Sequence, residues 1–339
     1  MSESITSTYS IKSPTRVDLA GGTLDMWPLY NFFGGAKTVN IAIDIFTSVE
    51  LQILGQAGTI ELESLDLKKK KFYLSYEKAI QDTDPDFVLY RIVLEYFKPS
   101  FGLKIKTSSE SPVGGGLGGS SSLMVSLLKA FSQALFKPFA SVHQLVEVAH
   151  NLEAQLLLTP TGTQDYYPAV SGGINLLEYT ASGIKQNLFN HKNLHEIEER
   201  FLLVYTGRSH HSGMNNFEVL QKAVARESKT IRALSSLRLV AEEMTAKVRA
   251  GLWKDLSELF RREYEFRVQL APAISSPEIE NLHRIAMGAG AEALKICGAG
   301  GGGCVLIWCP PEKKQQITDA CMQNDFQVMK AKPYPSYLK

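Results

Sequence analysis

Apolar and polar residues alternate along two stretches in the first third of the chain. In TSVELQIL (47–54) and FGLKIKT (101–107), the apolar side chains fall on every second position. This period of two is typical of strands that have one buried and one exposed face. SGGINLLEY (171–179) and FLLVYTG (201–207) are more continuously apolar, and we interpret them as strands as well.

Other stretches repeat their apolar residues at helical spacing. Leucines and a phenylalanine recur three or four residues apart over 121–136, which predicts a helix there. A second helix is predicted over 141–158 and is ended by Pro160. A charged helical stretch covers about 215–270, and ALKICGAGGGGCVLIWCP (293–310) predicts a strand, a glycine loop and another strand.

These predicted elements define a fold class and a domain division. Strands and helices mix without the regular βαβ repeat of a doubly wound sheet, so the predicted class is α+β. A chain of 339 residues is longer than most single cores, which predicts two domains. Because the composition shifts between about residues 180 and 200, we place an N-terminal domain at 1–185 and a C-terminal domain at 186–339.

The overall charge excludes some classes of partner. Lys plus Arg number 36 and Asp plus Glu 35, a formal charge of +1, so neither nucleic acid nor an anionic membrane is the expected partner. The four cysteines lie in the last 43 residues without a C-x-x-C pair, and we interpret them as reduced, mostly buried thiols. With no secretory signal pattern and no apolar run of membrane-spanning length, the expected location is cytoplasmic.

A glycine-rich loop is the strongest candidate for chemistry. SPVGGGLGGSSSLMVSLLKA (111–130) has five glycines in the six positions 114–119, between a predicted strand and a predicted helix. Glycines let the backbone approach a ligand closely, and a helix start presents unpaired N–H groups that favour an anion. No lysine follows the glycines as in a Walker loop, and the G-x-G-x-x-G match is weak in a glycine run. The loop therefore predicts phosphate binding, with a flexible loop before a Ser-capped helix as the alternative.

This loop resembles the second motif of the GHMP kinases, P-x-G-x-G-L-G-x-S-S, a family named for galactokinase, homoserine kinase, mevalonate kinase and phosphomevalonate kinase. Many members have Ser where this chain has Gly119, so Ser120 becomes the expected hydroxyl for phosphate or metal. The residues that the resemblance assigns to ATP here are Pro112, Gly114, Gly115, Gly116, Leu117, Gly118, Gly119, Ser120 and Ser121.

Two further segments are similar to the other motifs of this family, in the same order. SPTRVDLAGGTLD (13–25) resembles the first motif, and KICGAGGGGCVLI (295–307) resembles the third. The resemblance implies that the third glycine loop, with Gly300 and Gly301, helps to position the triphosphate. It also implies the family fold: a domain like ribosomal protein S5 domain 2, then a ferredoxin-like domain, with the active site between them.

The resemblance extends to the catalytic residues. In the family, a helical Glu coordinates Mg²⁺ and an Asp 11 or 12 residues later faces the substrate hydroxyl; Glu153 and Asp165 are 12 apart here. A cation that bridges phosphates needs carboxylate and hydroxyl oxygens, which assigns Glu153 and Ser120 to the metal. Asp165 is the expected proton acceptor, and Arg16 the basic residue that pairs with it and stabilises charge on the phosphoryl group. An exposed helix charge and a turn residue are the alternatives for the two acids.

On the substrate side, RVDLAGGTLD (16–25) is closer to the sugar-1-kinases, in particular to the branch around D-glycero-D-manno-heptose 7-phosphate kinase, than to the Lys and G-E-H pattern of mevalonate kinases. In that branch an Asp after the glycines binds sugar hydroxyls, and Asp25 is the matching residue, with a surface turn acid as the alternative. His210-His211 is a candidate metal pair, and His211 a candidate substrate contact. The expected substrate residues are Asp25, Gly22, Thr23, Gly173 and Arg208.

The sequence therefore predicts a kinase that uses ATP and Mg²⁺ to phosphorylate a sugar or sugar phosphate, a heptose 7-phosphate or a hexose, at the anomeric hydroxyl. The expected partners are this small molecule and ATP, in a monomer or a homodimer. Two alternatives stay open at this point: a mevalonate kinase-type enzyme and a non-catalytic ligand sensor of the same family.

Overall fold

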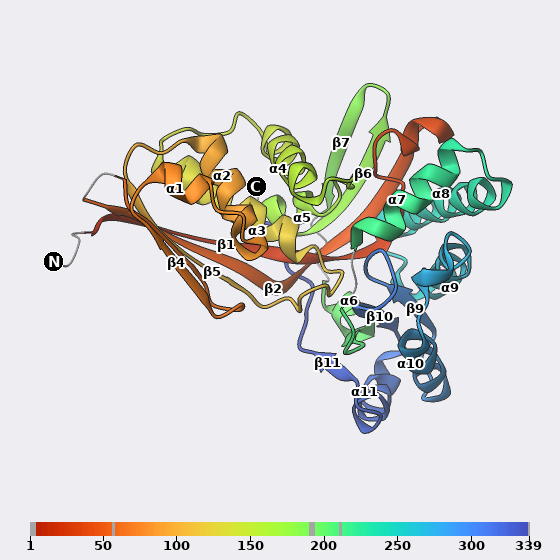
Figure 1. The fold of residues 1–339 in the computed structure, drawn as a ribbon. Coiled ribbons are helices and arrows are strands. Elements are labelled where there is room, and N and C mark those ends of the chain that lie inside the picture. The colour runs from red at the N-terminus through yellow and green to blue at the C-terminus, as the bar shows by residue number, and fades with distance from the viewer. Residues whose placement is uncertain (1–4, 56–57, 190–193, 210–211, 338–339) are drawn as a thin grey trace.

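The computed structural model describes residues 5–55, 58–189, 194–209 and 212–337. Two sheets organise these residues, and helices cover them (Figure 1). The strands are β1 (Ile5–Ala20), β2 (Ala36–Leu54), β3 (Ile60–Ser64), β4 (Lys69–Tyr73), β5 (Gly102–Ser109), β6 (Ile174–Thr180), β7 (Gly183–Phe189), β8 (Phe201–Tyr205), β9 (Ala293–Ile296), β10 (Cys304–Trp308) and β11 (Gln327–Met329).

The helices divide between the two halves of the chain. Those of the first half are α1 (Tyr76–Ile80), α2 (Val88–Phe97), α3 (Gly119–Ala134), α4 (Val142–Leu157) and α5 (Tyr166–Ser171). Those of the second half are α6 (Leu194–Arg200), α7 (Ser212–Val224), α8 (Ser228–Arg249), α9 (Leu256–Arg267), α10 (Pro277–Gly288) and α11 (Lys314–Gln323). The predicted charged stretch at 215–270 thus contains three helices, α7 to α9.

The first sheet has the order β4-β3-β5-β2-β6-β7, with β1 paired to β2, and only β3 and β5 run parallel within the described residues. β2 alternates buried and partly exposed residues from Thr47 onward, as the period of two predicted. Its buried side chains, such as Val49 and Leu51, pack with α2 and α3 in one apolar core. Figure 1 shows α1 to α5 lying along this side of the sheet.

The second sheet has the order β11-β8-β10-β9 and is antiparallel throughout. Along the chain its elements follow as strand, helices, strand, strand, helix and strand, which is the ferredoxin-like arrangement. The predicted α+β class is therefore confirmed. The predicted boundary after residue 185 falls inside β7, which continues the first sheet to Phe189. None of the residues of β7 is fully buried, so GIKQNLF lacks the alternation of apolar and polar residues that marks a strand.

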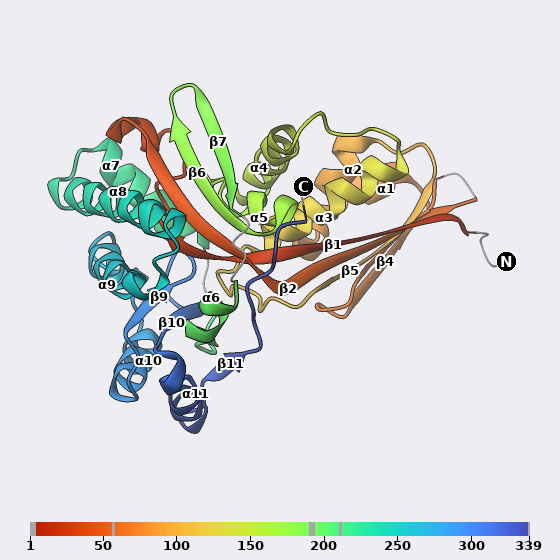
Figure 2. The same ribbon diagram turned by 180° about the vertical axis from the view of Figure 1, so that it is seen from behind.

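The two halves share an apolar core. Val17 and Ile41 of the first sheet are buried together with Met244 of α8 and Leu306 of β10. The end of the chain also returns to the first half: Tyr334 N–H donates to Ala42 O at 2.7 Å. Figure 2 shows this tail running from β11 back toward α5, where Tyr337 N–H donates to Ser171 O at 3.3 Å.

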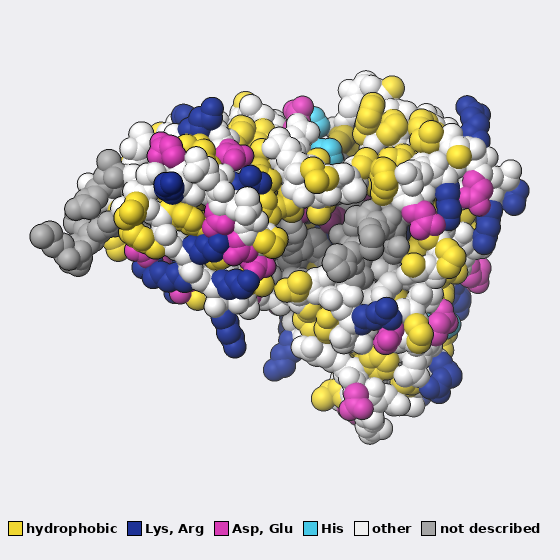
Figure 3. Space-filling model, in the orientation of Figure 1, with side chains coloured by type: hydrophobic (Ala, Val, Ile, Leu, Met, Phe, Trp, Pro, Cys, Tyr) yellow, Lys and Arg dark blue, Asp and Glu magenta, His cyan; other side chains and the backbone are white. Residues whose placement is uncertain are grey.

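The surface and the cysteines agree with the sequence. Figure 3 shows basic and acidic side chains interspersed over one face of the molecule, as the net charge of +1 suggests. All four cysteines are buried and free of disulfides. In the part of the chain that the structure describes, no helix has both the length and the apolar character needed to cross a membrane.

Candidate active site

A cleft of about 380 Å³ lies where the three glycine-containing motifs meet. Its walls come from β1 and the turn after it, the 112–119 loop, the start of α3, the segment before α5, and Cys297 to Ala299. It is also lined by Asn216 of α7, Arg267 of α9, Glu153 and Leu157 of α4, and Asp66, Leu67 and Leu89. Segments far apart in the sequence thus form one concave site of the kind that binds small molecules.

The first glycine loop (114–119) leads directly into a helix. Gly114, Gly116 and Gly118 have φ values of 64°, 72° and 70°, which is left-handed backbone that favours glycine. Gly118 is the N-cap of α3, so the N–H groups of the first turn have no acceptor inside the helix and form the positive end of its dipole. These features fit an anion such as a phosphate.

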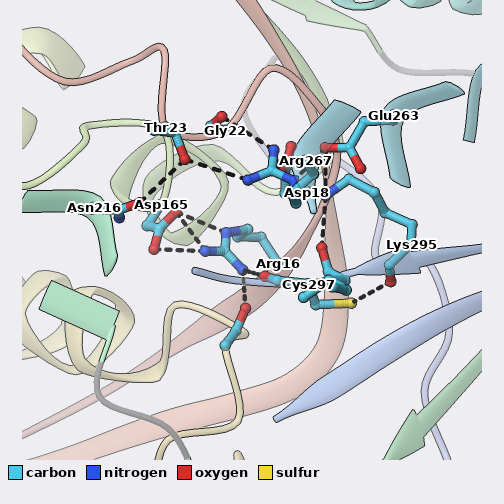
Figure 4. A network of polar contacts seen from close by, with 12 residues as sticks. Arg16, Asp18, Gly22, Thr23, Asp165, Asn216, Glu263, Arg267, Lys295 and Cys297 are labelled. Carbon is cyan, nitrogen blue, oxygen red and sulfur yellow. Dashed lines mark hydrogen bonds and ion pairs between the residues drawn. The ribbon is translucent and has the colours of Figure 1, made fainter. Parts of the chain in front are cut away.

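Arg16 connects the three motifs at the centre of the cleft (Figure 4). Its Nε and Nη2 donate to Oδ1 and Oδ2 of Asp165, each at 2.8 Å, in a bidentate pair. Nη1 donates to Gly116 O at 2.5 Å, in the first glycine loop, and to Cys297 O at 3.0 Å, in the third motif. Burial disfavours the charged guanidinium, but the attraction of Asp165 and Asp18 outweighs it and raises the Arg16 pKa above its ordinary value.

Asp165 lies at the start of α5, as its N-cap residue, and 24% of its side chain is exposed to the cleft region. It therefore stays reachable by a substrate while Arg16 fixes its orientation. Glu153 of α4 lies deeper, at 3% exposure, and accepts hydrogen bonds from Ser121 Oγ at 2.7 Å and from the Tyr166 hydroxyl. The structure thus brings Ser121 to Glu153, whereas the predicted Ser120 is exposed in the first turn of α3.

Asp25 lies on the other wall of the cleft and is 3% exposed. Its Oδ2 accepts the N–H of Gln164 at 3.0 Å. Burial, reinforced by repulsion from Asp165 and Asp18, raises the pKa of Asp25 to about 7 despite that hydrogen bond. A buried carboxyl that exchanges a proton near neutral pH, within a cleft, is a common mark of a functional site.

Next to Asp25, a buried ion cluster joins the two halves of the chain (Figure 4). It consists of Asp18, Glu263, Arg267 and Lys295, each at most 2% exposed. Lys295 Nζ lies 3.1 Å from Asp18 Oδ2 and 3.2 Å from Glu263 Oε1, and two cations balance two carboxylates. Burial alone would raise the pKa of Asp18, but Lys295 and Arg267 hold it below its ordinary value.

Models of two protein families match this chain. The GHMP kinases N-terminal domain matches residues 87–173, and the GHMP kinases C-terminal domain matches residues 244–327. Together the two models match half of the chain, and they contain the first glycine loop, Glu153, Asp165 and the third motif. This chain is a GHMP kinase.

Individual relatives agree with this assignment. D-glycero-alpha-D-manno-heptose 7-phosphate kinase of Campylobacter jejuni is 27% identical over 327 residues, 95% of each chain. Mevalonate kinase of Methanocaldococcus jannaschii is 26% identical over 336 residues, 94% of this chain and 97% of that one. A crystal structure of a D-glycero-D-manno-heptose 1-phosphate kinase from Bacteroides thetaiotaomicron has the same fold, with a TM-score of 0.78, 23% identity and 97% of each chain covered. The chain is thus an ATP-dependent phosphotransferase of the GHMP kinase family.

In this GHMP kinase, most of the predicted nucleotide residues and part of the predicted substrate set line the cleft. Arg16, Glu153, Asp165 and Asp25 all line it. So do Gly22, Thr23, Pro112, Gly114, Gly115, Gly116, Gly118, Gly119, Ser120 and Ser121, while Leu117 is fully buried behind the loop, and its carbonyl accepts the Arg16 N–H at 3.0 Å.

Gly300 and Gly301, which were predicted to bind ATP, are not among the residues that line the cleft. Gly301 N–H donates to Ile274 O at 2.7 Å, and a Cβ on Gly300 would lie 2.5 Å from the same oxygen. These glycines are needed because the loop passes against another part of the protein's own backbone. The third motif reaches the cleft through its start, Cys297 to Ala299, instead.

Gly173 and Arg208 also lie outside the cleft lining, contrary to their assignment to substrate. Gly173 N–H donates to Tyr334 O at 3.0 Å, so its positive φ of 67° serves the passage of the C-terminal tail. Arg208 is paired at the surface with Glu278, at 3.3 Å. His210 and His211 lie outside the described residues.

Sequence reasoning missed the ion cluster and Asn216. Asp18 follows Arg16 by two positions on β1, so strand periodicity places both on one face, and that was the available signal. Glu263 and Arg267 are spaced i, i+4 on α9, which is also the spacing of an exposed helix pair. Nothing in the spacing shows that this pair is buried.

Proposed function

We propose that this GHMP kinase transfers the γ-phosphoryl group of ATP to the anomeric hydroxyl of a sugar or sugar phosphate, either a heptose 7-phosphate or a hexose. The observation that carries the proposal is a group of oxygen acceptors on one wall of the cleft. Asp18 Oδ1 and Gln164 Oε1 are buried there and have no hydrogen-bond partner among the described residues. With the Asp25 carboxyl beside them, they suit a ligand that carries several O–H donors, because unpaired buried acceptors are costly.

The reacting hydroxyl would lie between this wall and Asp165. Asp165 accepts the proton of the hydroxyl as it attacks, and the bidentate Arg16 keeps the carboxylate in one orientation. Phosphoryl transfer depends mainly on positioning and on neutralising charge, and the Arg16 guanidinium supplies a fixed positive charge at the same place. Asp165 thus acts as the base, and Arg16 orients Asp165 and stabilises charge on the phosphoryl group.

The nucleotide would place its phosphates on the first glycine loop and the start of α3. Mg²⁺ usually takes one or two carboxylates together with phosphate oxygens and water. Glu153 and the Ser121 hydroxyl provide such oxygen donors, with Ser120 nearby on the cleft lining. When bound, the ion would neutralise charge on the phosphates. Among the described residues, no group of three or more His, Cys, Asp or Glu side chains could hold a metal ion, so the phosphates of ATP would provide part of its ligands.

Mevalonate phosphorylation is the second candidate, because the mevalonate kinase of Methanocaldococcus jannaschii is nearly as similar in identity and coverage as the heptose phosphate kinase relative. The unpaired acceptors favour the sugar, since mevalonate carries only two hydroxyls to satisfy them. The Lys and G-E-H pattern associated with mevalonate kinases is also absent here, where the chain has Arg16 and AGGTLD (20–25) instead.

The test is a phosphorylation screen of the purified protein with ATP and Mg²⁺. The acceptors are D-glycero-D-manno-heptose 7-phosphate, a panel of hexoses and mevalonate, with ADP release as the rate and phosphorus NMR of the product to locate the new phosphate. Asp165→Asn serves as the matched control for contaminating kinases. We expect turnover of a sugar or sugar phosphate with a new anomeric phosphate. Efficient turnover of mevalonate, with none of any sugar, would overturn the proposal.

A further inference from the structure

The turn that carries Asp25 is held in place from the other half of the chain. We define the acceptor turn as residues 21–26, between β1 and the segment that leads to β2. Within it, Leu24 N–H donates to Gly21 O at 3.2 Å and Met26 N–H to Thr23 O at 3.3 Å, both long bonds. Thr23 has a φ of 77°, an uncommon and strained conformation for a β-branched residue. The turn therefore needs outside support to keep one shape.

Arg267, the last residue of α9, supplies that support. Its Nη2 donates to Gly22 O at 3.1 Å and its Nη1 to Thr23 Oγ1 at 3.3 Å. Thr23 Oγ1 in turn donates to Oδ1 of Asn216, on α7, at 3.1 Å. Figure 4 shows the guanidinium between the acceptor turn and Glu263. The Thr23 hydroxyl, predicted to contact substrate, is thus occupied on two sides by protein.

The guanidinium is itself immobilised. Its Nε donates to Glu263 Oε1 at 2.5 Å, and Glu263 is held by Lys295, which also pairs with Asp18. Arg267 is 2% exposed and Glu263 fully buried. A planar fork that is fixed on one edge presents its remaining donors in a fixed direction. The cluster therefore holds Arg267 rigidly against the acceptor turn.

We propose that Arg267 is a positioning residue for the acceptor: it fixes the acceptor turn so that Asp25 meets the sugar, and thereby makes the second half of the chain a determinant of acceptor affinity. The inference rests on the proposed function for the identity of the acceptor. It does not involve the nucleotide, because none of the contacts of Arg267 described above reaches the first glycine loop.

The main test replaces Arg267 together with its partner. In Glu263→Gln/Arg267→Gln the cluster keeps one cation and one carboxylate, so no buried charge is left in excess. The KM for D-glycero-D-manno-heptose 7-phosphate should rise on the order of 10- to 100-fold, while the KM for ATP stays within about twofold, because only the acceptor side is displaced. The control is Glu258→Gln/Arg261→Gln, an exposed ion pair on the same helix, for which both constants should be unchanged.

Conservative variants sharpen this test and cover the case in which the double variant does not fold. Arg267→Lys keeps the charge but loses the fork, so it should restore the acceptor KM only in part. Thr23→Ala removes the hydroxyl that Arg267 and Asn216 share, whereas Thr23→Ser keeps it; only Thr23→Ala should raise the acceptor KM. Equal rises in the KM of ATP and of the acceptor, or no rise in either, would overturn the positioning role.

Hydrogen exchange of the ligand-free protein separates this inference from the proposed function. A peptide that covers residues 21–26 should exchange faster in Glu263→Gln/Arg267→Gln than in the wild type, and at the wild-type rate in the control. This result would support the positioning role even if no sugar proved to be a substrate. Unchanged exchange in the double variant would overturn it, whatever the acceptor.

Discussion

The two glycine loops meet beside the Arg16–Asp165 pair, but their backbones are used in different ways. The first loop, 114–119, ends at the N-terminus of α3 and leaves the N–H groups of the first helical turn at the cleft. The second loop, 298–303, belongs to the third motif. In it, Gly301 and Gly303 donate to the carbonyls of Ile274 and Arg208, each at 2.7 Å. The first loop therefore leaves backbone donors at the cleft, and the second uses its donors within the protein.

This difference assigns the second loop a supporting role. Immediately after it, Cys304 N–H donates to Gly115 O at 2.7 Å, so the start of β10 fixes the first loop from behind. Arg16 adds a second connection, since its Nη1 bonds both Gly116 O and Cys297 O. Glycine lets the backbone approach either a phosphate or another backbone segment closely. Similar glycine runs can therefore either bind a ligand or pack against and support a neighbouring loop.

The largest effect is expected at Asp165, which lies against Gly118 of the first loop. Asp165→Asn keeps the shape of the side chain and removes the proton acceptor. We expect kcat to fall on the order of 10²- to 10⁴-fold while ATP affinity changes little. Steady-state rates and ATP titration measure the two quantities.

A smaller loss would change the interpretation of the first loop. A fall of less than about tenfold in kcat, equivalent to about 1.4 kcal/mol of barrier, would mean that Asp165 only orients the acceptor. Arg16 and the donors of the first loop would then carry the catalysis. A large loss of ATP affinity would instead show that Asp165 shapes the loop itself.

The next effect concerns stability and tests the second loop. Gly300 has a φ of 84°, and a Cβ there would lie 2.5 Å from Ile274 O, which is backbone and cannot move aside cheaply. Gly300→Ala should therefore destabilise the protein by about 1–3 kcal/mol, seen as a lower midpoint of thermal unfolding. ATP affinity of the folded fraction should change little; a selective loss of ATP affinity with unchanged stability would show that this loop binds nucleotide after all.

Gly118→Ala is the matched change in the first loop. Gly118 has a similar φ, 70°, but its Cβ would meet the Asp165 side chain at 3.2 Å, not backbone. The methyl group should displace Asp165 and lower kcat on the order of tenfold to a hundredfold, with a smaller loss of stability than in Gly300→Ala. If the two alanine variants lose the same stability and the same activity, the division of roles between the loops is wrong.

Much of this site could be predicted because its sequence signals are local. Five glycines before a serine-rich helix start are a short-range pattern that indicates phosphate binding without further information. The resemblance to the GHMP kinase motifs added Arg16, Glu153 and Asp165, and all three line the cleft with this loop. The strand and helix periods likewise predicted β5, α3 and α4 closely, but only the last part of β2, from residue 47 to 54. The α+β class followed from the order of these elements.

The errors have a common physical origin in long-range contacts. Gly300 and Gly301 were assigned to ATP, and Gly173 to substrate, because each lies in a glycine motif; their actual neighbours are Ile274 and the C-terminal tail. The Glu263 and Arg267 pair has the spacing of an exposed helix pair, yet tertiary packing buries it. Spacing along the chain specifies which residues share a face, but not what that face packs against.

The smallest effect is expected on the acceptor side. There, the pH dependence of the KM for the sugar should reflect the ionisation of Asp25, which neither glycine loop affects. Burial raises the pKa of Asp25 to about 7, so the side chain is mostly protonated at pH 6 and mostly ionised at pH 8. An ionised carboxylate is the stronger acceptor for sugar hydroxyls, so the KM for the sugar should fall several-fold as pH rises through 7. Asp25→Asn should have a weaker affinity and lack this step, and subtracting its profile removes the titration of ATP and of the sugar phosphate. If wild type and Asp25→Asn show the same pH profile, then Asp25 does not bind the acceptor in its ionised form, and the wall formed by Asp18 and Gln164 would have to account for recognition alone.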